Sequence, residues 1–94
     1  MRYRKQYLDV DVAMNASGKM CPRMIHWTDG RCYEITRVKA VTPAPALKAG
    51  GQGDRYTIVL ENREKYLFFE RPTESDDASL VGRWFVEAPE IPNG

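Results

Sequence analysis

The sequence predicts a small all-β domain, and three observations lead to that prediction. Apolar and polar residues alternate with a period of two in almost every candidate segment, as in strands that bury one face. Turn-forming residues separate these segments, and helix signals are nearly absent. The chain has 94 residues, enough for one modest core. We therefore expect about six antiparallel strands that close into a small SH3-like barrel or β-roll with one long Gly/Pro-rich loop.

The alternation also sets the domain limits. We expect a single β domain over residues 7–87, preceded by a basic N-terminal segment (1–6) and followed by a flexible C-terminal tail (88–94). The six candidate strands cover residues 8–14, 23–27, 31–38, 55–61, 65–70 and 82–87.

The first predicted hairpin surrounds Asp29 and Gly30, the residue pair that best suits a two-residue type I′ turn. With that turn Trp27 pairs with Cys32, and His26 points to the opposite face from Cys32. Both faces of this hairpin carry apolar groups, which is typical of a strongly curved sheet.

A second hairpin is expected to turn at Asn62 and Arg63, because Asn tolerates left-handed backbone geometry. Its pairing places Tyr56, Ile58, Leu60, Leu67 and Phe69 on one face. The predicted core of the domain is Val10, Val12, Met24, Ile35, Val38, Ile58, Leu60, Leu67, Phe69, Trp84 and Val86.

The longest irregular stretch, Thr42–Asp54, contains two prolines and a run of glycines. Backbone N–H groups in such a loop can bind an anion, although the run lacks the residues of a phosphate-binding P-loop. The candidate ligand-binding residues are Lys48, Gly50, Gly51, Gly53, Arg55 and Tyr56. The alternative interpretation is structural, because glycines also let a strand bend or pass close to another backbone.

The chain contains more aromatic residues than one small core is expected to bury. We expect Tyr66, Phe68 and Trp84 to be partly exposed and to form an interaction surface, for an unidentified protein partner or for self-association. The predicted function is therefore that of a non-enzymatic binding or interaction module. The alternative is binding of an anion or of single-stranded nucleic acid through the Gly-rich loop and nearby aromatic and basic residues.

Charge argues against a dedicated nucleic-acid-binding protein. The formal net charge is only +1, and residues 66–94 carry −4. No stretch has the apolar length of a membrane span or of an export signal, so we expect a cytoplasmic protein with no membrane partner.

The sequence contains few features that indicate a catalytic site or a metal site. Cys21, His26 and Cys32 do not have the paired spacing of a structural zinc site, and the predicted pairing holds His26 and Cys32 apart. Cys21 and Cys32 are too far apart for a disulfide and are expected to be free thiols. Because no serine or cysteine has a base in reach, we expect no catalytic residues, no metal, no cofactor and no enzyme activity.

Several runs of residues together resemble a family of short proteins of Gram-positive bacteria that has no assigned function. These runs are Trp27–Arg31, Tyr33–Ile35, Leu47–Tyr56, Tyr66–Glu70 and Gly82–Glu87. The resemblance covers most of residues 7–87 and implies a compact, stand-alone β domain without implying any chemistry. The stretch Arg71–Val81 is longer and more acidic than the connection of that family.

Overall fold

The computed structural model describes residues 2–45, 52–72 and 78–90. Every regular element in these ranges is a β-strand, which confirms the predicted all-β class. The predicted number of six strands is wrong, because the described ranges contain seven. The strands are β1 (Tyr3–Met14), β2 (Met20–His26), β3 (Cys32–Glu34), β4 (Arg37–Pro45), β5 (Gln52–Leu60), β6 (Arg63–Glu70) and β7 (Arg83–Pro89).

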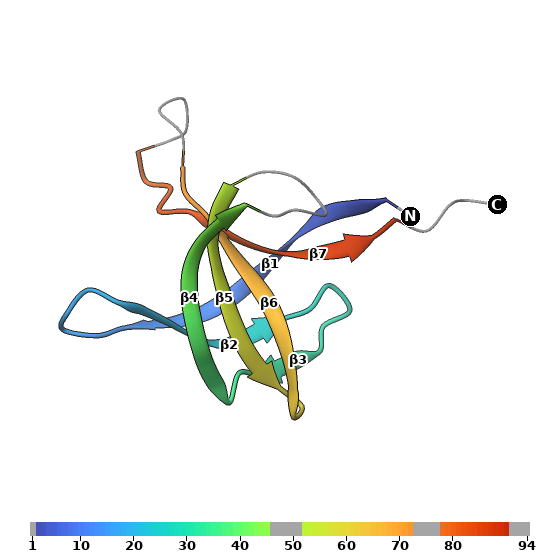
Figure 1. The fold of residues 1–94 in the computed structure, drawn as a ribbon, viewed down its shortest axis with the longest axis horizontal. Helices are drawn as coiled ribbons and strands as arrows, with labels where there is room; N and C mark the ends of the chain where they lie inside the picture. The colour runs from blue at the N-terminus through green and yellow to red at the C-terminus, as the bar shows by residue number, and fades with distance from the viewer. Residues whose placement is uncertain (1, 46–51, 73–77, 91–94) are drawn as a thin grey trace.

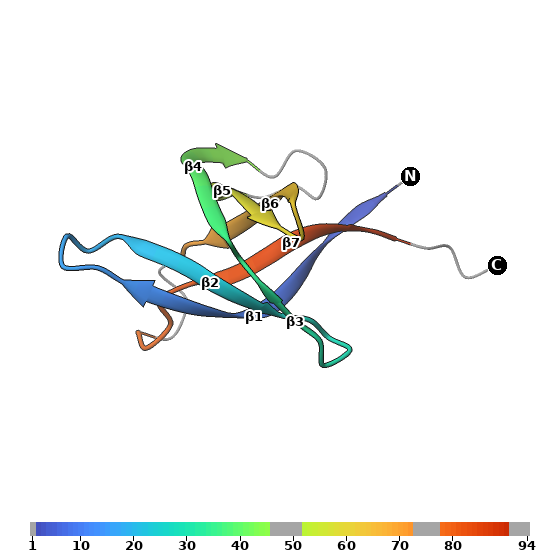
Figure 2. The same ribbon diagram turned by 90° about the horizontal axis from the view of Figure 1, so that it is seen from below.

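All seven strands form one antiparallel sheet in the order β3-β2-β1-β7-β6-β5-β4. The sheet curls into a half-barrel. In Figure 1, β1 and β2 cross behind β4, β5 and β6, and Figure 2 shows the same curl from below. The first and last strands pair with each other in the middle of the sheet, where Leu8 lies opposite Trp84.

The seventh strand arises at a corner, because the predicted strand 31–38 breaks into β3 and β4 at Ile35 and Thr36. The Ile35 N–H donates to the Arg23 carbonyl on β2 at 2.8 Å, whereas the Thr36 N–H donates to the Val59 carbonyl on β5 at 2.9 Å. Adjacent residues thus bond to opposite ends of the sheet. This corner draws the two ends together and produces the curl.

The turn between β2 and β3 is not the predicted type I′ turn. That turn needs a positive φ at two successive residues, but only Gly30, at 89°, has one, while Asp29 does not. The Gly30 N–H donates to the Trp27 carbonyl at 3.0 Å, and the Trp27 N–H donates to the Arg31 carbonyl at 2.8 Å. This pattern is a type I turn followed by a left-handed glycine, with three loop residues instead of two.

The extra loop residue moves the pairing of β2 with β3 by one position. His26 lies opposite Cys32, and Ile25 lies opposite Tyr33. The predicted pair of Trp27 with Cys32 is therefore wrong, and so is the prediction that His26 points away from Cys32. Because side chains alternate between faces, a shift of one residue reverses which of them are neighbours.

The turn between β5 and β6 is type I′, but one residue earlier than predicted. Glu61 and Asn62 have φ values of 52° and 62°, and Leu60 pairs with Arg63. Moving a turn by one residue changes the pairing by two positions, and an even shift leaves every side chain on its own face. The predicted division of these two strands into faces is therefore correct.

The predicted irregular stretch Thr42–Asp54 is partly strand. β4 continues to Pro45 and β5 starts at Gln52, and these two residues are register partners. Residues 46–51 lie outside the described residues. The sheet also reaches the predicted flanking segments, because Tyr3 at the start of β1 pairs with Pro89 at the end of β7.

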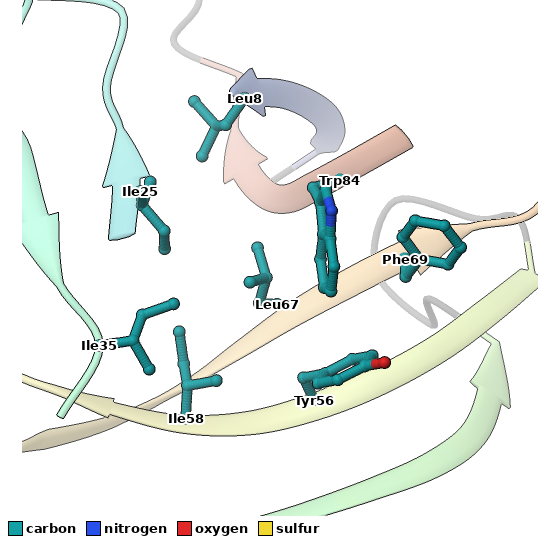
Figure 3. Packing of buried hydrophobic residues seen from close by; sticks show 8 residues of the cluster. All are labelled: Leu8, Ile25, Ile35, Tyr56, Ile58, Leu67, Phe69 and Trp84. Atoms are coloured by element: carbon teal, nitrogen blue, oxygen red, sulfur yellow. The ribbon is translucent and has the colours of Figure 1, made fainter. Parts of the chain in front are cut away.

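The main core fills the concave face of the half-barrel (Figure 3). The Trp84 ring packs edge-on against the rings of Tyr56 and Phe69, with both pairs of ring centroids 4.9 Å apart. Burying each large side chain contributes about 1.5 to 3 kcal/mol. The cluster consists of Leu8, Ile25, Ile35, Tyr56, Ile58, Leu67, Phe69 and Trp84.

Most of the predicted core is confirmed. Five predicted residues are buried, and Val10, Val38, Leu60 and Val86 are partly buried against them. Val12 is exposed, so its assignment to the core is wrong. The register of β1 with β2 shifts between Asp11 and Val12, and beyond that shift the hairpin projects past the rest of the sheet (Figure 1).

Candidate functional site

A cavity opens on the concave face where β6 and β7 part. Their register pairs run only from Phe68 to Glu70 on β6. From Val86 onward β7 is paired with β1, while the first half of β6 is paired with β5. The cavity between them has a volume of about 370 Å³. Its lining residues are Ile25, Trp27, Tyr33, Ile58, Leu60, Glu61, Lys65, Val86 and Glu87.

The wall of this cavity is mainly apolar and includes two half-buried aromatic rings, Trp27 and Tyr33. Both rings come from the β2–β3 hairpin, where the three-residue loop pairs Tyr33 with Ile25 and so places Tyr33 on the core face. Three charged side chains complete the lining, the carboxylates of Glu61 and Glu87 and the ammonium of Lys65.

The convex face carries a second aromatic cluster. The rings of Phe68 and Phe85 stack with centroids 5.2 Å apart and planes 11° apart, and both are buried. Lys5 and Tyr7 cover this pair, with the Lys5 Nζ 5.1 Å from the centre of the Phe85 ring. Arg83 in turn lies 4.4 Å above the Tyr7 ring. Cation–π contacts thus form a charged cover over an apolar pair.

Lys5 and Arg83 share the carboxylate of Glu70. It accepts from Lys5 Nζ at 2.6 Å, from Arg83 Nη2 at 2.8 Å and from the Tyr7 hydroxyl at 3.1 Å. Burial by itself would raise the pKa of Glu70. The hydrogen bonds from Lys5, Tyr7 and Arg83 outweigh burial, so the pKa of Glu70 lies below its ordinary value.

Arg55 and Tyr66 lie beside this cluster. The guanidinium carbon of Arg55 is 4.7 Å from the centre of the Tyr66 ring, and that ring is 53% exposed. The Arg55 Nε is buried and has no hydrogen-bond partner among the described residues. This pair offers an open aromatic surface next to a positive charge.

The predicted interaction surface is thus only partly at the surface. Tyr66 is exposed as expected, but Phe68 is 2% and Trp84 8% exposed, so the predicted exposure of those two rings is wrong. The sequence count of aromatic residues missed that both faces of the sheet bury rings, Trp84 in the main core and Phe68 under Lys5 and Tyr7. Self-association through this surface stays a prediction.

The predicted ligand-binding set does not form one site. Lys48, Gly50 and Gly51 lie outside the described residues. Arg55 and Tyr56 point to opposite faces, and Tyr56 is buried in the core. Burial, followed by the negative charge of Asp54, raises the pKa of Tyr56.

Gly53 supports the structural interpretation of the glycine run. A Cβ at this position would collide with the backbone carbonyl of Phe69 on β6. Glycine is therefore needed here because two backbones approach closely, which is one of the two interpretations that the sequence left open.

A third arrangement joins Asp11, His26 and Cys32, from three adjacent strands. The His26 Nε2 lies 3.0 Å from Asp11 Oδ2, and the His26 Nδ1 lies 3.2 Å from Cys32 Sγ. This arrangement is not apparent from the sequence, because the predicted register for β2 and β3 was wrong by one residue.

The contacts of His26 also bear on metal binding. Its two ring nitrogens face different partners, so Asp11 and Cys32 do not converge on one point. No group of three or more His, Cys, Asp or Glu side chains in the described ranges is arranged to hold a metal ion. Cys21 and Cys32 are both free thiols.

Comparisons with protein-family models, with curated proteins and with solved structures gave no match. The resemblance to a family of Gram-positive bacteria therefore stays a prediction. The described part of the chain contains no helix long and apolar enough to cross a membrane. Functional proposals for this protein accordingly rest on the chemistry of the residues themselves.

Proposed function

We propose that this protein is a small binding module whose cavity between β6 and β7 takes a compact ligand with an apolar body. The observation that carries the proposal is the 370 Å³ cavity with Trp27 and Tyr33 in its wall. Pockets for small molecules start at roughly 300 Å³, so the space suits one ring or a short branched chain.

The aromatic rings of the lining define the end group of this ligand. Trp27 and Tyr33 attract cations through their ring faces and repel anions. The ligand class that fits is therefore an aromatic or aliphatic group with a neutral or cationic end. An anionic end group would be repelled.

This function can be tested with three ligands that share a phenyl ring and differ in the charge of the end group. We expect benzyltrimethylammonium and benzyl alcohol to change the fluorescence of Trp27 on titration, and benzenesulfonate to bind more weakly. Tyr33→Ala should lower the affinity for benzyltrimethylammonium about tenfold, because one aromatic contact contributes about 1 to 1.5 kcal/mol.

The matched control is Tyr66→Ala, which removes a tyrosine from the convex face and should leave this binding unchanged. Equal affinity of the Tyr33→Ala and wild-type proteins for benzyltrimethylammonium would refute the proposal.

A second candidate function is binding of single-stranded nucleic acid on the convex face. The Arg55 guanidinium beside the exposed Tyr66 ring favours it, because bases stack on aromatic rings beside basic side chains. Lys5 and Arg83 lie on the same face, where both pair with Glu70.

For this candidate we expect a fluorescently labelled oligothymidylate to show a rise in anisotropy at low salt that declines steeply as salt is added. Tyr66→Ala should weaken binding about tenfold or more, since stacking contributes about 1 to 3 kcal/mol per base. Here Tyr33→Ala is the control that should bind normally. No rise in anisotropy at low salt would eliminate this function.

A further inference from the structure

We propose that Cys32 is a nucleophilic thiol, activated by His26 as a base and with Asp11 as the positioning residue, that undergoes thiol–disulfide exchange with small neutral or cationic disulfides. The proposal is independent of ligand binding in the cavity. It rests on the geometry of Asp11, His26 and Cys32.

The proton positions follow from the partners of the imidazole ring. An ionised carboxylate only accepts hydrogen bonds, so the His26 Nε2 carries the proton that Asp11 Oδ2 receives at 3.0 Å. In the neutral ring the other nitrogen, Nδ1, then has a free lone pair. That lone pair faces Cys32 Sγ at 3.2 Å, within reach of the thiol proton.

The strand pairing holds this arrangement in place. His26 and Cys32 are register partners of β2 and β3, and Asp11 lies on β1, the strand on the other side of β2. The Cys32 residue is exposed, so a small molecule can reach its sulfur. A base in position and an open approach are the two requirements of a reactive cysteine.

The second cysteine, Cys21, is less exposed than Cys32 and has no histidine within reach. Cys21 is only partly exposed, and it lies five residues from His26 along β2, a distance of roughly 17 Å. His26 is the only histidine of the chain, and both its ring nitrogens are engaged by Asp11 and Cys32. Cys21 is therefore an internal reference for an unassisted thiol.

The proposed step balances as a simple exchange. The Cys32 thiol proton moves to His26 Nδ1, and Sγ attacks one sulfur of the disulfide RS–SR. A new Sγ–S bond forms as the S–S bond breaks, and the leaving RS⁻ takes the proton back from His26 to become RSH. Cys32 ends as a mixed disulfide, and a second thiol reverses the step.

Charged neighbours select the disulfide. Asp9 is the register partner of His26, and Asp11 and Glu34 lie two residues further along the same face. Arg31 precedes Cys32 but is paired with Asp29. The carboxylates on this face therefore repel anionic disulfides.

The test uses the full chain and 2,2′-dithiodipyridine, an uncharged disulfide whose released thiopyridone is coloured. At neutral pH we expect Cys32, measured in Cys21→Ser, to react about tenfold faster than Cys21, measured in Cys32→Ser. In denaturant the two thiols should react at the same rate. Equal rates in the folded proteins would overturn the proposal.

Variants of the partners separate activation from exposure. We expect His26→Asn to lower the rate of Cys32 about tenfold, and that difference should close at high pH, where hydroxide removes the thiol proton in both proteins. His26→Gln provides a second variant should His26→Asn not fold. A His26 variant that folds and keeps the full rate of Cys32 would refute base assistance.

Asp11 is tested against Asp9, its neighbour on the same face. Asp11→Asn should lower the rate of Cys32 at neutral pH several-fold, whereas Asp9→Asn should change it less, because only Asp11 contacts the ring. The anionic disulfide 5,5′-dithiobis(2-nitrobenzoate) should react more slowly than 2,2′-dithiodipyridine relative to their rates with unfolded protein. Equal effects of the two Asp variants would remove the positioning role of Asp11.

Discussion

At the scale of single residues, Glu70 combines the largest number of polar contacts that the structure describes on the convex face. Its carboxylate accepts from Lys5 and Tyr7 on β1 and from Arg83 on β7. The lower pKa of Glu70 means that the folded protein favours the ionised form more than the unfolded chain does. The contribution to stability is therefore present above the unfolded pKa and is lost as the pH falls through the folded pKa.

We expect Glu70→Gln to lower the free energy of unfolding by about 1 to 2 kcal/mol at neutral pH, because it removes a partly buried charged acceptor. The loss should shrink at acidic pH, where Glu70 in the wild type becomes protonated. Urea denaturation at a series of pH values measures both effects. Glu64→Gln, at the exposed pair of Glu64 with Lys39, is the control and should cost less. A loss that stays constant down to acidic pH would contradict the lowered pKa.

At the scale of elements, the two hairpins show that similar errors in a predicted turn can have different effects on strand register. Asp-Gly suits both a type I′ turn and a type I turn followed by a left-handed glycine. The sequence of the β2–β3 hairpin does not distinguish them, and the choice moved every pair by one residue. The turn at Glu61 and Asn62 was also misplaced, but by an even shift in pairing that left the faces correct.

The functional consequences follow from this difference. The core face of β5 and β6, with Ile58, Leu67 and Phe69, was predicted correctly from alternation, whereas the burial of Phe68 on the other face was not. On β2 and β3, the corrected register brings His26 to Cys32 and pairs Tyr33 with Ile25 beside the cavity. The sequence contains a detectable signal for this alternative, because a three-residue loop at Thr28, Asp29 and Gly30 is the next common hairpin.

At the scale of the whole molecule, the pairing of β1 with β7 joins the two ends of the described chain. Four register pairs, from Tyr3 with Pro89 to Gln6 with Val86, lie at least partly outside the predicted domain of 7–87. The Arg2 carbonyl also accepts from the Glu90 N–H at 2.8 Å. Residues 3–6 and 86–89 thus belong to the central strands of the sheet.

We expect a chain shortened to residues 7–87 to unfold at a temperature about 10 °C lower than the full chain, because it loses these pairs and the contacts of Lys5 with Glu70 and Phe85. Circular dichroism on heating measures this change. A chain of residues 2–90 keeps both strands and is the control that should unfold like the full chain. Equal melting of the 7–87 and 2–90 chains would contradict a structural role for the ends.

The sequence by itself determined the all-β class, the strand segments and most of the buried side chains, because alternation with a period of two is a local property of each strand. Tertiary structure alone decided the strand order, the corner at Ile35 and Thr36, and the meeting of residues from separate strands. The cavity, the cover over Phe68 and Phe85, and the contacts of His26 are all formed by side chains from separate strands. They depend on register and curvature, which are set by contacts across the whole sheet rather than by neighbours in the chain.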